Sequence, residues 1–405
     1  MASSRGTHRF GPGLLVAAAF IGPGTITTAS KAGASFGFAL AWAIVFSVVA
    51  AIVLQEMTAR VGLVTRGGLG EAIRASVTQP ALRTAAVVLV VAAIAVGNAA
   101  YQTGNITGAA LGLEVLTGWS RPALSLLIAA AAGVLLATGS YKIIERVMIA
   151  LVVLMSGVFL VTAVVIRPDV GALVHGMFVP GVPAGGLVMT IALIGTTVVP
   201  YNLFLHASVV CEKWPSDVPV AEAIRDSQRD TVLAIVLGGA VTLAVMITAT
   251  SLESGFTDAA AMAKQLEPLL GAWAKWFFAM GLLAAGVTSA MTAPLAAAYA
   301  TCGALGRATS MHGAGFRAVW GVVLVIGTAC ALLFGKTPVQ AIVFAQAANG
   351  LILPVVAVFL LIVVNRARIM GIHANRPMVN VLGVAVVLVA TGLGVWKLLR
   401  LFGLS

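Results

Sequence analysis

The sequence predicts an all-α membrane protein whose chain crosses the bilayer in about eleven hydrophobic helices. The chain has 405 residues, of which 60% are hydrophobic and only 9% are charged, whereas a soluble domain carries about a quarter charged residues. Apolar runs of roughly 20 residues, the length that spans a bilayer, recur along the chain, and the charged residues gather between them. A soluble fold of this composition would expose far too much apolar surface, so we exclude it.

The first apolar run follows two basic residues, Arg5 and Arg9, as in a signal peptide. It continues through Gly22 and Pro23 without a small-residue cleavage site, so we interpret it as the first membrane helix. In chain order, we expect helices over residues 12–36, 38–63, 84–113, 122–139, 143–166, 184–211, 230–251, 272–302, 316–335, 339–364 and 379–400.

The basic residues between these runs predict the orientation of the chain in the membrane. With a cytoplasmic N-terminus, fifteen Lys and Arg residues fall in cytoplasmic segments and seven in outer segments. Positive residues favour the cytoplasmic side. We therefore expect a multi-pass protein of the bacterial inner membrane with its N-terminus in the cytoplasm. The net charge of +11 lies in these short loops and forms no basic face, so we expect no nucleic-acid partner.

Two of the expected helices are interrupted near their middle. The interruptions are Gly22-Pro23-Gly24-Thr25 in the first helix and Val199-Pro200-Tyr201-Asn202 in the sixth. Proline removes an amide donor and clashes with the preceding turn, and glycine lets the chain unwind. Paired broken helices in two halves of a chain are typical of inverted-repeat transporters with a binding site at the midplane. We expect one transporter domain, with repeat one over 12–166, repeat two over 184–364 and an extra helix over 379–400.

Several segments resemble the Nramp family of divalent-metal transporters. The segments that carry the resemblance are Gly11-Pro12-Gly13, Lys31 to Gly37, Thr58 to Thr65, Gly108 to Leu113 and Asn202 to His206. The resemblance covers most of the chain. It implies a LeuT-like fold, in which two inverted repeats of five helices are followed here by an eleventh helix and helices one and six are broken.

The metal-binding positions of that family are changed in this chain. The family's helix-one motif, Asp-Pro-Gly-Asn, corresponds to residues 22–25, and its helix-six motif, Met-Pro-His-Asn, corresponds to residues 199–202. The carboxylate, the thioether and the first histidine are absent. An acidic pair that serves proton passage on helix three corresponds to Gln102 and Asn105. Because divalent cations need anionic or strongly donating ligands, we expect no metal site here and no proton route through helix three.

The broken helices favour an anion as the substrate. Helix N-termini present free amides and partial positive charge. Because residue 22 is glycine, the N-terminus at the break in helix one has no carboxylate to offset this charge. We expect a substrate site formed by Gly22, Pro23, Gly24, Thr25, Thr28, Val199, Pro200, Tyr201, Asn202, Gln346 and Asn349. Its hydroxyl and amide groups suit a small monovalent inorganic anion, and the lack of an arginine clamp argues against phosphate. Among such anions we expect bicarbonate, while nitrate, formate and halides stay open. The alternative function is a divalent metal (manganese, iron or magnesium) transporter of the Nramp type.

Four further polar residues lie along the expected pathway, namely Lys31, Gln102, Asn105 and His206. Lys31 either attracts anions at the outer mouth or snorkels to the interface. The two amides either line a hydrated route or join helices as polar contacts. His206 either binds a backbone carbonyl or takes part in transport.

Other classes of function lack support in the sequence. There is no nucleotide-binding loop, GxSxG, HExxH or CxxC, so we expect no enzymatic activity. The cysteines Cys211, Cys302 and Cys330 are too widely spaced to suggest a disulfide frame or a metal site. The short termini argue against a sensor, and a carrier of a neutral solute ranks third. We expect no cofactor apart from a coupling sodium ion, and a monomer in the lipid bilayer.

Overall fold

The computed structural model describes residues 21–138, 142–307 and 309–401, and the regular structure among them is helical. The long helices are α3 (Ala41–Thr65), α5 (Pro80–Thr117), α6 (Arg121–Thr138), α7 (Lys142–Val165), α11 (Val220–Ala249), α14 (Ala274–Leu305), α15 (Ala314–Leu333), α16 (Pro338–Val364) and α18 (Pro377–Leu401). Three shorter helices belong to the predicted first and sixth spans: α2 (Pro23–Phe36), α9 (Leu187–Thr197) and α10 (Pro200–Lys213).

The number of spans agrees with a polytopic membrane protein. Among the described residues, nine spans are long and apolar enough to cross a membrane, and α9 and α10 together count as one of them. Helix α7 is not among the nine; α7 and α8 (Val170–Phe178), bent by 120° where they join, make a tenth if they are taken as one span. The first expected helix, over 12–36, is not among the nine, because its residues 12–20 lie outside the part of the chain that the structure describes.

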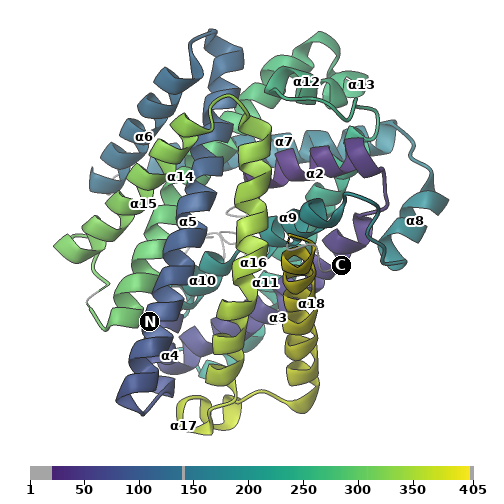
Figure 1. Ribbon diagram of the computed structural model, residues 1–405. Helices are drawn as coiled ribbons and strands as arrows, with labels where there is room; N and C mark the ends of the chain where they lie inside the picture. Colours follow the sequence, from purple (N-terminus) through teal and green to yellow (C-terminus); the bar gives the residue numbers. More distant parts are fainter. Residues whose placement is uncertain (1–20, 139–141, 308, 402–405) are drawn as a thin grey trace, which may run out of the picture.

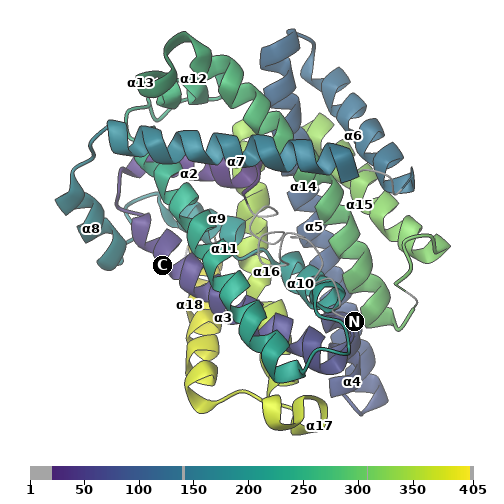
Figure 2. The same ribbon diagram turned by 180° about the vertical axis from the view of Figure 1, so that it is seen from behind.

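The broken helices lie at the centre of the bundle (Figure 1). Helix α2 contacts α5, α9, α11 and α16, and α10 contacts α3, α5, α14 and α16. Helices α6 and α15 lie together on one side, while α18 lies beside α16 on another. Figure 2 shows α7 running across the back of the bundle, where it contacts α11 and α14. This arrangement surrounds the interrupted segments with helices.

Small residues allow the inner helices to approach each other closely, as in other membrane bundles. A Cβ atom on Gly108 of α5 would lie 2.7 Å from Cγ of Pro23, which is too close for a real contact. A Cβ on Gly286 of α14 would lie 2.5 Å from Cβ of Ala109. Helix α5 therefore packs directly against the start of α2 on one side and against α14 on the other.

Some predicted boundaries are wrong, and the errors have a common cause. Helix α11 begins at Val220, ten residues before the expected start at 230, and α5 begins at Pro80 instead of 84. Short helices also occupy expected loops: α4 (Leu69–Ser76), α8, α12 (Ala259–Ala263), α13 (Glu267–Leu270) and α17 (Ala367–Met370). The prediction followed apolar runs of bilayer length. Helical turns with charged residues beyond the bilayer carry no such signal.

Candidate transport site at the broken helices

The predicted interruption of the sixth span is present as two separate helices. Helix α9 ends at Thr197, Val199 has an extended backbone (φ −80°, ψ 120°), and α10 begins at Pro200. At the first span, Gly22 is extended and α2 begins at Pro23. Neither α2 nor α10 has a capping side chain or an acidic residue in its first turn. Both N-termini therefore have free amides, as expected from their sequences.

The sixth-span break also presents a helix end of the opposite sign. The backbone N–H of Val198 donates to the carbonyl of Ile194 at 2.9 Å and closes the last turn of α9. The carbonyl groups that follow Ile194 at the end of α9 have no amide partner within the helix. The C-terminus of a helix also carries partial negative charge. The break thus offers carbonyl oxygens as well as amides.

Direct contacts bring the two breaks together. The hydroxyl oxygens of Thr25 in α2 and Thr196 in α9 are 2.8 Å apart. The rings of Tyr101 in α5 and Tyr201 in α10 meet edge to face, with centroids 5.1 Å apart. Of these four residues, the sequence analysis had included only Thr25 and Tyr201. Tyr101 directly precedes Gln102, so the polar run on the third span was the signal that could have identified it.

Gly22 lies against residues of α5 and α14. A Cβ atom on Gly22 would be 2.9 Å from Oγ of Ser289 and 3.6 Å from the hydroxyl oxygen of Tyr101. Ser289 is completely buried in α14, and its hydroxyl has no hydrogen-bond partner among the described residues. It therefore belongs to the same polar cluster, although no motif in the sequence indicated it.

Gln346 and Asn349 both belong to α16. Gln346 packs against the start of α2, and Asn349 packs against α5. A Cβ atom on Gly24 would be 2.5 Å from Cδ of Gln346, and one on Gly104 of α5 would be 3.6 Å from its Nε2. Oδ1 of Asn349 would be 3.2 Å from a Cβ on Gly97. The amide of Gln346 thus packs on the first break, whereas that of Asn349 faces α5 about two turns before Gly104.

Many buried polar atoms of this region have no hydrogen-bond partner among the described residues. They include both amide atoms of Asn202 and Gln346, the hydroxyl groups of Thr27, Thr28 and Ser289, and Nδ2 of Asn349. A buried polar group without a partner costs about 1–3 kcal/mol, and most native structures have few of them. We call the group formed by Gly22, Gly24, Thr25, Thr28, Thr196, Tyr101, Tyr201, Asn202, Ser289 and Gln346 the central polar cluster.

The predicted pathway residues differ from this cluster because most of their polar atoms are paired. Nε2 of Gln102 donates to the carbonyl of Ala290 at 3.0 Å, and Nδ2 of Asn105 donates to the carbonyl of Ser289 at 3.1 Å. Nδ2 of Asn105 also lies 3.3 Å from Oε1 of Gln102. These amides join α5 to α14, which is the polar-contact alternative from the sequence.

His206 and Lys31 also have partners. Nδ1 of His206 is 2.8 Å from Oε1 of Gln55 in α3, so the partner is a side-chain amide and not a backbone carbonyl. The ammonium group of Lys31 donates to the carbonyls of Ser254 and Phe256, and it lies 4.7 Å from the centroid of the Phe256 ring. Lys31 therefore holds the segment between α11 and α12.

Acidic side chains lie away from the central polar cluster. Glu56 of α3 forms an ion pair with Arg60 at 3.2 Å and accepts from Gln228 of α11 at 2.9 Å. In the part of the chain that the structure describes, no group of three or more His, Cys, Asp or Glu residues is arranged to hold a metal ion. Any cation at the cluster would meet only neutral oxygen donors.

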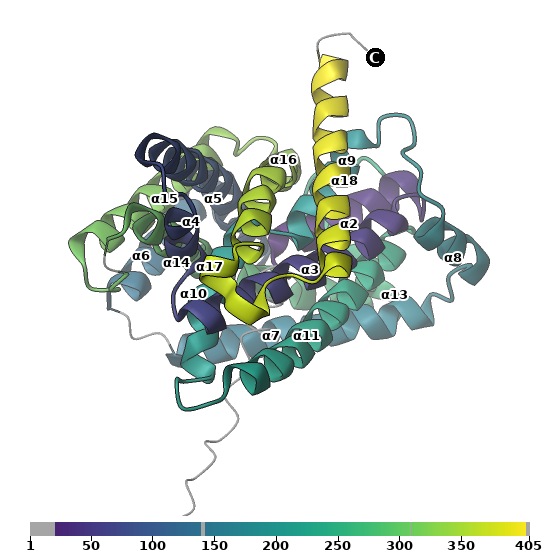
Figure 3. The same cartoon turned by 90° about the horizontal axis from the view of Figure 1, so that it is seen from below.

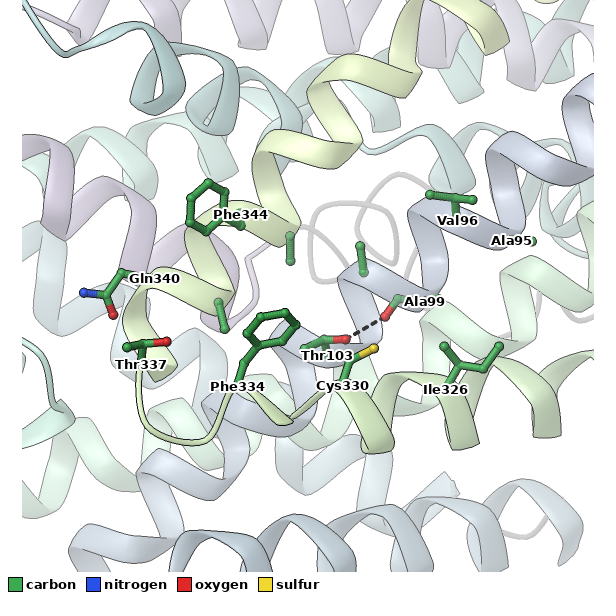
Figure 4. A pocket seen from close by; sticks show the side chains of 13 residues that line it. Ala95, Val96, Ala99, Thr103, Ile326, Cys330, Phe334, Thr337, Gln340 and Phe344 are labelled. Atoms are coloured by element: carbon green, nitrogen blue, oxygen red, sulfur yellow. Dashed lines mark hydrogen bonds between the residues drawn. The ribbon is translucent and has the colours of Figure 1, made fainter. Parts of the chain in front are cut away.

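A large, mostly apolar cavity of the described chain is separate from the cluster. It has a volume of about 600 Å³ and lies between α5, α15 and α16, where Figure 4 shows Val96, Ile326, Phe334 and Phe344 around it. Thr103, on its wall, donates to the carbonyl of Ala99. No residue of the predicted substrate site lines this cavity.

The helical bundle, the break between α9 and α10 and the start of α2 beside it are typical of a membrane transporter, since broken helices that meet at the midplane form the binding sites of secondary transporters. The family model described as "Natural resistance-associated macrophage protein-like" (Nramp) matches residues 13–400, and the chain belongs to this family. The chain is therefore a multi-pass membrane transporter and not an enzyme.

Relatives and solved structures agree with this assignment. The chain is 28% identical over 397 residues to the divalent metal cation transporter MntH of Yersinia pestis (strain Pestoides F), covering 96% of this chain and 94% of that one. It is also 28% identical to MntH of Pectobacterium carotovorum subsp. carotovorum (strain PC1), covering 96% and 93%.

The solved structures show the fold. The manganese transporter of Eremococcus coleocola, in complex with an aromatic bis-isothiourea substituted compound, has a TM-score of 0.78, 23% identity, and coverage of 95% of this chain and 84% of that one. A nucleobase-cation-symport-1 family transporter in a closed conformation has a TM-score of 0.57 and 16% identity, covering 98% and 95%. The predicted LeuT-like fold is confirmed.

The predicted transport of bicarbonate or another small anion is wrong. The curated relatives carry the name of divalent metal cation transporters, and the similar solved structure is a manganese transporter. The prediction counted only the N-termini at the breaks. The C-terminal end of α9 lies at the same place and supplies carbonyl oxygens that favour a cation.

Proposed function

We propose that this protein transports a divalent metal cation across the bacterial inner membrane, by alternating access around the central polar cluster. The observation that supports this most is the group of buried oxygen atoms without partners where the two breaks meet, in a chain whose curated relatives are named divalent metal cation transporters. The cytoplasmic N-terminus and the monomeric state remain predictions, as does a coupling sodium ion.

The donors of the cluster suit a hard cation. Oδ1 of Asn202 and Oε1 of Gln346 are amide oxygens without partners among the described residues, and the last carbonyls of α9 add backbone oxygens. Hard cations bind oxygen ligands, whereas thioether and thiolate groups favour softer metals. With valine at position 199 and glycine at position 22, the chain has neither the thioether nor the carboxylate of the family motif.

Neutral donors alone replace a divalent ion's hydration shell poorly. Mg²⁺ in particular gives up water reluctantly and usually keeps several water molecules when it is bound. We therefore propose that the cluster receives the cation with part of its hydration shell, and that the amides and hydroxyls bind the retained water. Such a site selects by charge and size more than by ligand softness, so magnesium and manganese are both expected cargoes.

Uptake into proteoliposomes tests this function. The purified protein is reconstituted, and the entry of manganese and magnesium is followed with lumenal metal-sensitive dyes. We expect saturable uptake of both ions, with magnesium competing for manganese entry. Asn202→Leu, which has a similar volume and no oxygen donor, serves as the inactive variant.

The control is Asn365→Leu, because Asn365 is exposed at the end of α16, where its amide nitrogen binds Leu361 and Asn380. Uptake by this variant is expected to match that of the unmodified protein. Absence of divalent-cation uptake by monodisperse, folded protein contradicts the proposal. Equal loss in the two Asn variants contradicts the site.

A further inference from the structure

A second cavity, which has a polar lining, lies at the end of the bundle where α3, α11 and α18 meet. Figure 3 views this end of the molecule, with α17 and the start of α18 in front of α3 and α11 nearby. The cavity has a volume of about 520 Å³. Its charged and polar lining consists of Glu56, Arg60, Arg225, Gln228, His373 and Arg376. We call it the arginine pocket.

Arg60 forms the inner wall of the arginine pocket. It is only 8% exposed, and its guanidinium group donates to the carbonyl of His373 at 3.0 Å, to Glu56 at 3.2 Å and to Asn375. Its Nε atom is buried and has no partner among the described residues. An ionised group buried this far is costly unless it is paired, and the contacts of its two terminal nitrogen atoms hold the positive charge of Arg60 in this wall.

Arg225 and Arg376 leave the pocket with excess positive charge. Glu56 is its single acidic residue, and Arg60 and Gln228 already occupy both oxygens of that carboxylate. Arg225 in α11 and Arg376 before α18 are exposed, and their side chains have no hydrogen bond or ion pair within the described part of the chain. Two arginines facing one cavity favour an anion with several oxygen atoms, such as a phosphate group.

The remaining wall is apolar and continues onto the lipid-facing side of the bundle. Ile52, Val379 and Leu382 line the pocket, as does Ile372, which is 95% exposed. Met378 and Val381 extend this apolar surface along the first turns of α18 and are 71% and 64% exposed. A soluble phosphate would use only the arginines, whereas a lipid would use both parts of the surface.

We propose that the arginine pocket binds the phosphate headgroup of an anionic phospholipid, with the acyl chains lying along α18. Basic pockets between membrane helices at the cytoplasmic side are a known way of holding such headgroups. The start of α18, the start of α11 and the end of α3 all fall on the cytoplasmic side in the predicted orientation. The bound lipid links α18 to α3 and α11 through its phosphate.

Binding of defined lipids to the full-length protein tests this site. Native mass spectrometry of the purified protein is used with dioleoyl phosphatidylglycerol and, for comparison, dioleoyl phosphatidylcholine, which has the same chains and no net charge. We expect tighter binding of phosphatidylglycerol. In the double variant Arg225→Gln/Arg376→Gln, its affinity is expected to fall about thirtyfold, since each arginine near the headgroup is worth about fivefold.

Two matched variants separate the site from general charge effects. Arg229 lies one turn further along α11 than Arg225 and does not line the pocket. Arg229→Gln therefore removes a positive charge outside the pocket, and we expect affinity within about twofold of the unmodified protein. Arg225→Lys/Arg376→Lys keeps both charges and is expected to retain most of the binding. An equal loss in Arg229→Gln, or equal binding of the two lipids, overturns the proposal.

A competition experiment distinguishes the lipid from a free anion. Inorganic phosphate at millimolar concentration is added to the complex with phosphatidylglycerol. We expect the lipid to stay bound, because its chains also contact the apolar wall. Displacement by phosphate, with phosphate binding that depends on Arg225 and Arg376, overturns the assignment to a lipid.

Discussion

Two pairs of buried side-chain amides in this protein have different hydrogen-bonding environments. Gln102 and Asn105 of α5 bind each other and the carbonyls of α14, and only Oδ1 of Asn105 has no partner in the described structure. Asn202 of α10 and Gln346 of α16 are equally buried, yet all four of their amide atoms are without described partners. The first pair joins two helices, whereas the second is available to a ligand or to water.

This difference separates structural amides from binding amides. A satisfied amide contributes to stability, and its removal leaves the partner carbonyls unpaired. An unsatisfied amide contributes little to stability, so its presence requires a reason such as a bound ion or bound water. Substitutions at the two pairs should therefore affect different measurements.

The largest effect is expected from restoring an acidic residue at Gly22. In Gly22→Asp combined with Ser289→Ala, the close contact of the new Cβ atom is removed, since Oγ of Ser289 is the atom that would lie 2.9 Å from it. Attraction between unit charges at 4 Å is worth about 4 kcal/mol at an effective dielectric constant near 20. Desolvation offsets part of this, so we expect about hundredfold tighter manganese binding, measured by calorimetric titration.

The control for this substitution is Gly22→Asn with Ser289→Ala, which adds similar bulk without charge. It should bind manganese about as tightly as Ser289→Ala alone. If the Asp variant binds no more tightly than the Asn variant, the cargo does not lie beside Gly22 and the central polar cluster is misassigned.

A smaller but still large effect is expected at Asn202. Replacing Asn202 with Leu preserves volume and removes two buried polar atoms that have no described partners. We expect divalent-cation uptake to fall at least tenfold, because a donor to the hydrated ion is lost, while the melting temperature stays the same or rises. Uptake and thermal unfolding are measured on the same preparation. A large fall in melting temperature would show that Asn202 is a structural amide.

The opposite pattern is expected for Gln102. Gln102→Leu removes the hydrogen bond to the carbonyl of Ala290 and leaves Asn105 with one partner fewer. Hydrogen bonds between membrane helices are worth about 0.6–2 kcal/mol, so we expect a melting temperature lower by a few degrees. Uptake per folded molecule should stay within about twofold. A selective loss of uptake would instead support a hydrated route through α5.

The fold could be predicted from the sequence because the bilayer imposes a strong pattern. Apolar runs of bilayer length located the described spans, and the Pro200 interruption located the break between α9 and α10. The start of α11 could not be placed in this way. Its first ten residues are helical and include Glu222, Arg225, Asp226 and Arg229, and helical turns outside the bilayer are held by neighbouring contacts that leave no hydrophobic signal.

The site was predicted in part. The motif positions gave Thr25, Tyr201 and Asn202, and the structure brings Gln346 to Gly24 from a distant helix. Ser289 and Tyr101 reach the same place from α14 and α5, and only tertiary packing reveals this. The sign of the cargo was missed because the sequence shows helix breaks without showing which helix ends face one another.

The smallest expected effect concerns Lys31, where the sequence left electrostatic attraction and interfacial placement open. Its ammonium group binds the carbonyls of Ser254 and Phe256 and the Phe256 ring, so we expect a local structural role. Lys31→Met keeps the length of the side chain and removes these contacts, worth about 1 kcal/mol together at a partly exposed site. Amide hydrogen exchange in residues 251–258 should become about fivefold faster, while divalent-cation uptake changes less than twofold. Lys264→Met, at an exposed lysine of the adjoining segment, should leave both measurements unchanged. A salt-dependent change in uptake without faster exchange would show that Lys31 acts on the approaching ion instead of on the loop.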